Sequence, residues 1–258
     1  MRAAKQVGIL SGPLRYDSVT PVVRRRFAAV APGICGLALL FGTIGPAGAQ
    51  DGKKTAFSSM APVAQYRIAS RSEEIALARS AAPASISRDA DVLVLGDRGY
   101  ESAVKGKNGF VCLVERSWFA SFGDPVFWNP SIRGPDCLNP AAVSSVLPVN
   151  LERTQWALAG LSKSEMLART KTSAVAHQAP APGSMGYMMS KQGHLSDVDG
   201  HWQPHLMFFQ SHTAPSAWGA NLPGSPVMGG EGDPDEVTIF YVPVGKWSDG
   251  TTASMDMH

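Results

Sequence analysis

Three short apolar runs, separated by turn residues, predict neighbouring β-strands in the first half of the chain. They are Val92–Leu95, Tyr100–Lys105 and Phe110–Val114. The dipeptide Asn108–Gly109 precedes the third run and favours a two-residue hairpin, because both residues tolerate a positive φ. The pattern therefore predicts a three-stranded antiparallel meander.

The third of these runs has apolar side chains on both faces of the expected sheet. Side chains alternate along a strand, so Phe110, Cys112 and Val114 share one face, while Val111 and Leu113 share the other. A sheet that is apolar on both sides needs a cover on both sides. We therefore expect helices or a second layer on each face.

Two helix starts are indicated by a serine followed three residues later by a glutamate. The pairs are Ser70 with Glu73 and Ser162 with Glu165, each followed by apolar residues. A further helix is expected over residues 151–161. Such capping pairs satisfy backbone N–H groups that the first helical turn leaves without partners.

The rest of the chain predicts strands near 185–189, 205–209 and 237–242, and a long loop over residues 117–140. The 26 glycines and 19 prolines indicate many loops. Strands, then helices, then strands favour an α+β fold over a parallel α/β fold. We expect one domain over residues 70–247, with a small antiparallel sheet, packed helices and long Gly/Pro-rich loops.

The N-terminal segment has the three-part pattern of a secretory signal peptide. The basic cluster Arg24–Arg26 precedes an apolar stretch from Phe27 to Ile44, and small residues follow. Cleavage is expected between Ala49 and Gln50. The arginines also resemble the twin-arginine export signal. The apolar stretch is interrupted by glycines and a proline, so we expect no permanent transmembrane span.

Export and cleavage would leave the domain with flanking segments of different character. We expect a removed signal peptide over residues 1–49, a flexible tether over residues 50–69 and a frayed tail over residues 248–258. Export would place the mature protein in the periplasm or outside the cell.

Removal of the signal peptide would change the sign of the net charge. Residues 1–49 hold six of the 23 basic residues and one of the 21 acidic residues, which leaves 17 basic and 20 acidic residues. The mature chain would thus carry about three negative charges and no basic stripe. Nucleic-acid binding therefore loses its usual electrostatic support.

Two of the three cysteines, Cys112 and Cys137, would remain after cleavage, whereas Cys35 would be removed. An even number of cysteines in an exported chain indicates a disulfide. With two cysteines only one intrachain pairing exists, so we expect a Cys112–Cys137 bond.

The segment 117–140 is rich in aromatic residues, which has two interpretations. Trp118, Phe119, Phe127 and Trp128 either pack over the sheet or form a platform that binds a carbohydrate or a peptide. Packing is the interpretation that we favour, because core aromatics are common in such loops.

A group of histidines between residues 194 and 212 is the strongest indication of chemistry. Imidazole and carboxylate groups are ligands that suit zinc and similar divalent ions. If a site exists, His201, His205 and Asp199 are the first expected ligands, with His212 and His194 in reserve. The alternative interpretation is that these histidines are ordinary loop residues.

Established catalytic and nucleotide-binding motifs do not occur in the sequence: Walker A, G-x-G-x-x-G, G-x-S-x-G and H-E-x-x-H are all missing. The runs Ala78–Pro83, Asn108–Val114 and Pro204–Phe208 resemble those of a group of uncharacterised exported bacterial proteins. This resemblance implies export and transfers no catalytic residue, because no activity is established for the group.

These observations favour an exported domain without enzymatic activity, which binds an unidentified ligand or a component of the cell envelope. The alternative function is that of a metal-dependent hydrolase that uses the patch from His194 to His212. In that case three protein ligands would leave a position on the metal for an activated water.

Overall fold

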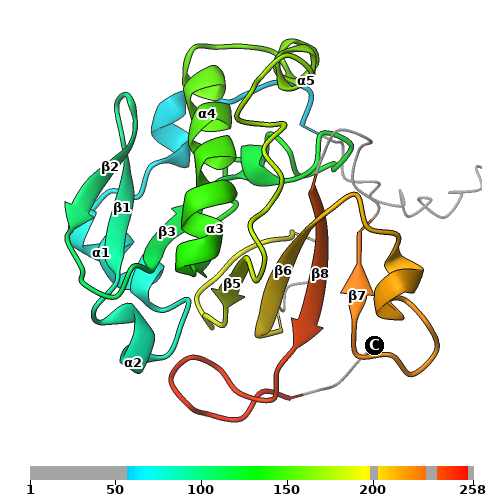
Figure 1. Ribbon diagram of the computed structural model, residues 1–258. Helices are drawn as coiled ribbons and strands as arrows, with labels where there is room; N and C mark the ends of the chain where they lie inside the picture. Colours follow the sequence, from blue (N-terminus) through cyan, green and yellow to red (C-terminus); the bar gives the residue numbers. More distant parts are fainter. Residues whose placement is uncertain (1–56, 198–202, 231–236, 255–258) are drawn as a thin grey trace, which may run out of the picture. The chain divides into compact units, whose positions relative to one another are not determined.

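The computed structural model describes residues 57–197, 203–230 and 237–254. These residues form one mixed sheet with helices on both faces (Figure 1). The strands are β1 Asp91–Gly96, β2 Gly99–Val104, β3 Val111–Glu115, β4 Gly134–Leu138, β5 Met185–Met188, β6 His205–Ser211, β7 Met228–Gly229 and β8 Val237–Pro243. The α-helices are α1 Arg71–Arg79, α2 Ala84–Ser87, α3 Pro140–Ser145, α4 Leu147–Leu158 and α5 Lys163–Thr170. The 3₁₀ helices are η1 Val63–Tyr66, η2 Ser117–Phe119 and η3 Pro215–Trp218.

The sheet has eight strands in the order β2-β1-β3-β4-β5-β6-β8-β7. Neighbouring strands are antiparallel except β1 and β3, which are parallel. An α+β fold is therefore confirmed, but the sheet is much larger than the small sheet expected from the sequence.

The predicted meander is wrong in its third strand, because β3 pairs with β1 and not with β2. The loop between β2 and β3 passes the start of β1 and hydrogen-bonds to it. The Lys107 and Asn108 N–H groups donate to the Asp89 carbonyl, and the Gly106 N–H donates to the Asp91 carboxylate at 2.5 Å. These bonds carry the chain to the far side of β1, so Asn108–Gly109 forms no hairpin between β2 and β3.

β4 lies inside the segment that the sequence predicts to be a loop. Gly134 and Pro135 disfavour a strand in isolation, since proline donates no ladder hydrogen bond. All of β4 is nevertheless buried, and it pairs with β3 along its whole length. Burial and long-range pairing therefore override the local propensity of these residues.

The two faces of the sheet are covered by different helices (Figure 1). Under α1, Ala78 packs with Val92, Cys112 and Val114 in a cluster of small side chains. On the opposite face α3 and α4 cover a second cluster, which includes Leu113. The predicted alternation of apolar side chains along β3 is thus confirmed, and both faces are covered.

Both predicted helix starts are present. The Ser70 hydroxyl accepts from the Glu73 N–H at the start of α1. Ser162 and Glu165 form a reciprocal capping box at the start of α5. The third predicted helix corresponds to α4, which ends at Leu158 shortly before Gly160, whose φ is +79°.

The described parts of the expected tether and tail pack against the domain. Tyr66 is fully buried, and its hydroxyl donates to the Trp128 carbonyl at 2.8 Å. Near the C-terminus Ala253 is buried, and Lys191 forms an ion pair with Asp249 at 2.8 Å. These contacts extend the packed domain beyond residues 70–247 on both sides.

A buried ion pair ties α1 to the sheet. Arg116 Nη2 donates to Glu74 Oε1 at 2.8 Å, and neither side chain is appreciably exposed. The same guanidinium donates to the Tyr66 carbonyl, while Glu74 accepts from the Leu95 N–H. The buried charges are thus neutralised and hydrogen-bonded, as such groups must be in a protein interior.

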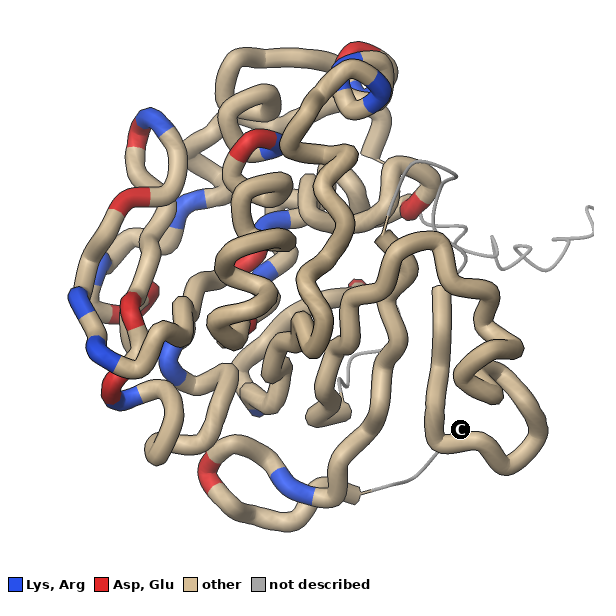
Figure 2. The backbone as a smooth tube through the Cα atoms, viewed as in Figure 1, with Lys and Arg blue, Asp and Glu red and all other residues tan. Residues whose placement is uncertain are grey.

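Charged residues are unevenly distributed over the domain (Figure 2). Lys, Arg, Asp and Glu gather around β1, β2 and α1, and around α5. The region of β6, η3, β7 and β8 carries none, because residues 203–230 and 237–245 contain no such residue.

Candidate functional site

Two carboxyl groups lie together on the face of the sheet that α3 and α4 cover. Glu115 is the last residue of β3, and Asp136 is in the middle of β4. The register places Gly134 opposite Glu115, and Asp136 opposite Leu113. Because side chains alternate along each strand, Glu115 and Asp136 are diagonal neighbours on one face.

Burial raises the pKa of both groups. Desolvation raises the pKa of Glu115 to about 7, although its interaction with Asp136 and the charge of Arg153 oppose this. Burial is also the largest cause of the strongly raised pKa of Asp136, and the charge of Glu115 adds to it. Two carboxylates so close together cannot both ionise easily, so the pair retains a proton at neutral pH.

Two glycines make room for this acid pair. A Cβ atom at Gly186 of β5 would lie 2.5 Å from Asp136 Oδ1. At Gly134 a Cβ atom would lie 2.8 Å from Leu195 Cδ2 and 3.3 Å from the Cβ of Glu115. The Asp136 carboxyl group therefore occupies space that a larger residue at Gly186 would fill, whereas Gly134 leaves room for Leu195 and the base of the Glu115 side chain.

His205 and Tyr241 lie on the same face, further along the sheet. Their rings are 5.6 Å apart. His205 is buried, which lowers its pKa to about 4, and its Nδ1–H donates to the Gln203 carbonyl at 3.0 Å. Burial and the charge of Glu115 raise the pKa of Tyr241 to about 12. Both side chains are therefore neutral at pH 7.

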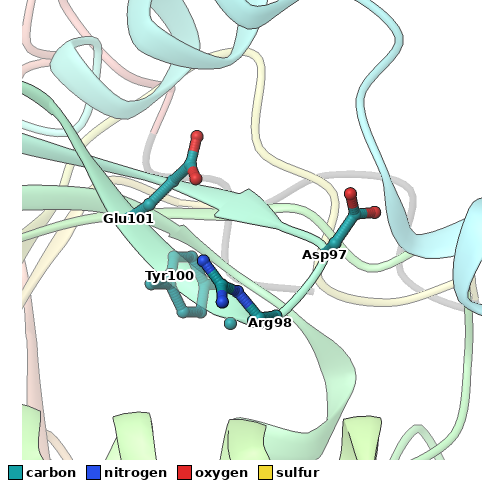
Figure 3. A pocket seen from close by; sticks show the side chains of 5 residues that line it. Asp97, Arg98, Tyr100 and Glu101 are labelled. Atoms are coloured by element: carbon teal, nitrogen blue, oxygen red, sulfur yellow. The ribbon is translucent and has the colours of Figure 1, made fainter.

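The acid pair lies apart from two hollows on the surface of the described residues. One has about 300 Å³ and is formed by the turn between β1 and β2 (Figure 3). Its two carboxylates already have partners, since Asp97 pairs with Arg67 and Glu101 pairs with Arg71.

The other hollow has about 510 Å³ and lies between residues 58–63, the end of α4 and the start of α5. Neither hollow is lined by Glu115 or Asp136.

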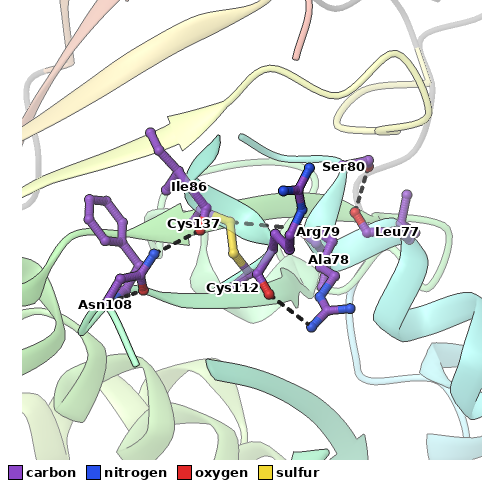
Figure 4. The surroundings of a disulfide bond; sticks show 10 residues. Leu77, Ala78, Arg79, Ser80, Ile86, Asn108, Cys112 and Cys137 are labelled. Atoms are coloured by element: carbon purple, nitrogen blue, oxygen red, sulfur yellow. Dashed lines mark hydrogen bonds between the residues drawn. A yellow bond between two sulfur atoms is a disulfide. The ribbon is translucent and has the colours of Figure 1, made fainter. Parts of the chain in front are cut away.

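The predicted disulfide is present. Cys112 of β3 and Cys137 of β4 are directly opposite each other, and both are fully buried. Figure 4 shows the bond next to Ala78 of α1. The disulfide and the acid pair thus lie on opposite faces of the same two strands. The acid pair could have been found from the predicted cysteine pairing. If Cys112 and Cys137 face each other on antiparallel strands, Asp136 lies opposite Leu113 and therefore diagonal to Glu115.

The predicted metal ligands are only partly described. His201 and Asp199 lie outside the described residues, so a site built on them stays a prediction. His205 starts β6 and His212 follows its end, so at about 3.3 Å per residue they are roughly 20 Å apart and cannot share an ion. His194 binds Asp197 at 2.8 Å. In the ranges with assigned structure, no three His, Cys, Asp or Glu residues are grouped for metal binding.

The aromatic residues of segment 117–140 belong to the core. Trp118, Phe127 and Trp128 are buried, and Phe119 packs against the same cluster. The Phe127 and Trp128 rings meet edge to face at 4.7 Å. The packing interpretation therefore describes these side chains, and they form no open platform for a ligand.

The uncharged region around β7 is a second candidate site, which the sequence analysis missed. Among the described residues, four large hydrophobic side chains are exposed, and three of them are in this region: Trp218 at 37%, Leu222 at 57% and Met228 at 48%. The sequence has no Lys, Arg, Asp or Glu from residue 200 to residue 230. This long uncharged run is the feature that could have located the region.

Comparison of the chain with models of protein families, with curated proteins and with solved structures found no match. In the part of the chain with a described structure, the longest α-helix has 12 residues, and none is both long and apolar enough to cross a bilayer.

Proposed function

We propose that the protein is exported, is cleaved between Ala49 and Gln50, and acts as a binding domain of the cell envelope without catalytic activity. Three observations support export: the basic cluster, the apolar stretch and the small residues before Gln50. The disulfide between Cys112 and Cys137 fits an oxidising compartment.

The observation that carries the binding role is the uncharged region with exposed Trp218, Leu222 and Met228. The buried centres of protein interfaces are depleted in charged residues and enriched in aromatic residues and methionine. Exposed apolar side chains without charged neighbours in the sequence are a common feature of interaction sites.

The acid pair is compatible with this role. Asp136 is completely buried, so a substrate would contact its carboxyl group only if the surrounding strands separated. We therefore assign the pair to the response of the domain to pH, and we assign the binding role to the uncharged region.

The test of this proposal is expression of the full chain in a bacterium, followed by cell fractionation and intact-mass measurement. We expect a product that starts at Gln50, sediments with the envelope fraction and contains an oxidised Cys112–Cys137 pair. Signal peptidase reads small residues at positions −1 and −3, so Ala49→Phe should retain the leader.

The matched control is Gly48→Phe, which adds the same side chain at a position that signal peptidase does not read. This variant should be cleaved like the unmodified chain. A full-length product with reduced cysteines in the cytoplasmic fraction would contradict the proposal.

A further inference from the structure

The segment from Pro215 to Gly229, which we call the edge loop, forms the end of the sheet at β7 (Figure 1). It contains η3 and β7 and carries no Lys, Arg, Asp or Glu. β7 pairs with β8 through Met228 and Gly229, so the loop doubles back over the last strand.

The exposed side chains of the edge loop are held in defined positions. The Trp218 ring stacks on the Phe240 ring with a centroid distance of 4.5 Å and an interplanar angle of 2°. Met228 pairs with Tyr241 and Gly229 with Phe240, so Met228 points to the opposite face of the sheet from the Phe240 ring. Apolar groups therefore project on both sides of the edge.

Several backbone groups of the edge loop are paired within the loop. Asn221 Nδ2 donates to the Gly229 carbonyl at 2.8 Å, and Asn221 Oδ1 accepts from the Gly229 N–H at 3.1 Å. The Asn221 N–H donates to the Val227 carbonyl, and the Ala220 N–H donates to the Pro215 carbonyl. The asparagine side chain thus occupies the place of a further strand beside Gly229.

Two features of this arrangement favour contact with lipid: the paired backbone at Asn221 and Gly229, and the lack of charged side chains. Backbone polar groups in an apolar medium must be paired within the protein, and charged side chains there are costly. Tryptophan is favoured at the boundary between lipid and water, where its ring is apolar and its N–H remains hydrated.

We propose that the edge loop inserts Trp218, Leu222 and Met228 into a lipid surface of low net charge. This inference rests on the proposed function and names its partner. A lipid surface fits better than an added β-strand, because Asn221 already binds the outward N–H and carbonyl groups of Gly229. The sequence that follows, residues 231–236, contains four acidic residues, so anionic lipids would repel the loop.

The test is flotation of the protein with phosphatidylcholine vesicles, combined with tryptophan fluorescence. The protein is used in the form in which it accumulates in cells, with or without residues 1–49. All comparisons are made between variants of the same form, so any contribution of the apolar stretch Phe27–Ile44 cancels. A failure to bind vesicles would overturn the lipid proposal only. Export, the other part of the proposed function, is tested separately by cell fractionation and intact-mass measurement.

We expect the unmodified protein to float with the vesicles and its fluorescence to shift to shorter wavelength. Leu222→Asp and Met228→Asp should each reduce vesicle partitioning roughly tenfold or more, because a carboxylate resists transfer into lipid. Trp218→Phe should abolish most of the fluorescence shift while the protein still binds.

The matched control is Phe57→Asp, which places the same charge at an exposed hydrophobic residue outside the edge loop, one that is 40% exposed. This variant should float as the unmodified protein does. Replacing half of the phosphatidylcholine by phosphatidylglycerol should weaken binding.

Three results would overturn the proposal. One is that the unmodified protein stays in the aqueous phase. Another is that Leu222→Asp and Met228→Asp float unchanged. The third is that these substitutions abolish a dimer in solution without affecting flotation, which would assign the edge loop to a second copy of the chain.

Discussion

At the scale of single residues, Asp136 and Glu115 make the stability of the fold dependent on pH. Each holds its proton more tightly in the folded chain than its ordinary pKa allows, 3.8 for Asp136 and 4.5 for Glu115. The unfolded chain therefore loses these protons first as the pH rises. The stability from the protonated pair is complete below the ordinary pKa values and declines above them.

His205 acts in the opposite direction and over a lower range. Its pKa falls from 6.5 to about 4 on folding, so the unfolded chain binds the extra proton first. Stability from the neutral imidazole is present above pH 6.5 and declines as the pH falls toward 4. Above pH 6.5 the pH dependence of stability therefore reflects the acid pair without a contribution from His205.

We predict that the free energy of unfolding declines between pH 6.5 and 8.5, by up to about 1.4 kcal/mol per pH unit for each proton involved. Asp136→Asn should flatten this decline, since the amide has no proton to lose in this range. Urea unfolding at several pH values measures the slope.

The control for this experiment is Asp97→Asn on the exposed turn between β1 and β2. It removes a carboxylate whose side chain is 84% exposed, so the slope should not change. An equal slope in Asp136→Asn and the unmodified protein would contradict the prediction.

At the scale of secondary-structure elements, the parallel pairing of β1 with β3 depends on a close approach of two backbones. A Cβ atom at Gly106 would lie 2.3 Å from the Asp89 carbonyl oxygen and 2.5 Å from the Asp91 nitrogen. Neither backbone atom can rotate away, so the crossing of the chain past β1 requires glycine.

We predict that Gly106→Ala destabilises the protein by roughly 2–3 kcal/mol, because the added methyl group overpacks a site bounded by backbone. Thermal or urea unfolding measures the change. Gly123→Ala is the matched control, because a Cβ atom there has no neighbour within 4 Å. A similar loss of stability in both variants would show that the crossing does not require glycine.

Elements that depend on local signals were predictable from the sequence, whereas those that depend on distant partners were not. The helix starts at Ser70 and Ser162 follow from residues within one turn. β4 contains Gly134 and Pro135 and exists because β3 pairs with it. The Asn108–Gly109 pair predicts a hairpin that does not form, since hydrogen bonds to the Asp89 carbonyl direct the chain past β1.

The same distinction applies to the candidate sites. The Cys112–Cys137 bond could be predicted from the number of cysteines that remain once an exported chain has lost Cys35. The acid pair depends on the register of β3 and β4, which places Glu115 and Asp136 together only once Cys112 is paired with Cys137 across two antiparallel strands. The edge loop was predictable in part, since its lack of charge is a property of sequence, but the exposure of Leu222 is a property of the fold.

At the scale of the whole molecule, the disulfide joins two adjacent inner strands of the sheet, β3 and β4. It closes a chain segment with a sequence separation of 25 residues. That segment contributes Trp118, Phe122, Phe127 and Trp128 to the core. A link across a loop of this length restricts the unfolded chain more than it changes the folded one.

We predict that the double variant Cys112→Ala with Cys137→Ala loses roughly 3–4 kcal/mol of stability in the chain-entropy model. Urea unfolding of the two proteins measures this difference. Dithiothreitol should lower the stability of the unmodified protein by a similar amount and leave the double variant unchanged. A reductant effect of equal size on both proteins would contradict the prediction.

The position of this bond also determines how the chain would respond to a pulling force. Because the link is covalent, tension applied through the two termini passes from Cys112 to Cys137 without loading the residues between them. At roughly 3.3–3.6 Å per extended residue, those residues would add about 80 Å to the length of the stretched chain, but only after the bond is reduced. An oxidised chain under tension would thus extend in two steps. The first is unfolding of the residues outside the disulfide loop, and the second is extension of the loop after the disulfide is reduced.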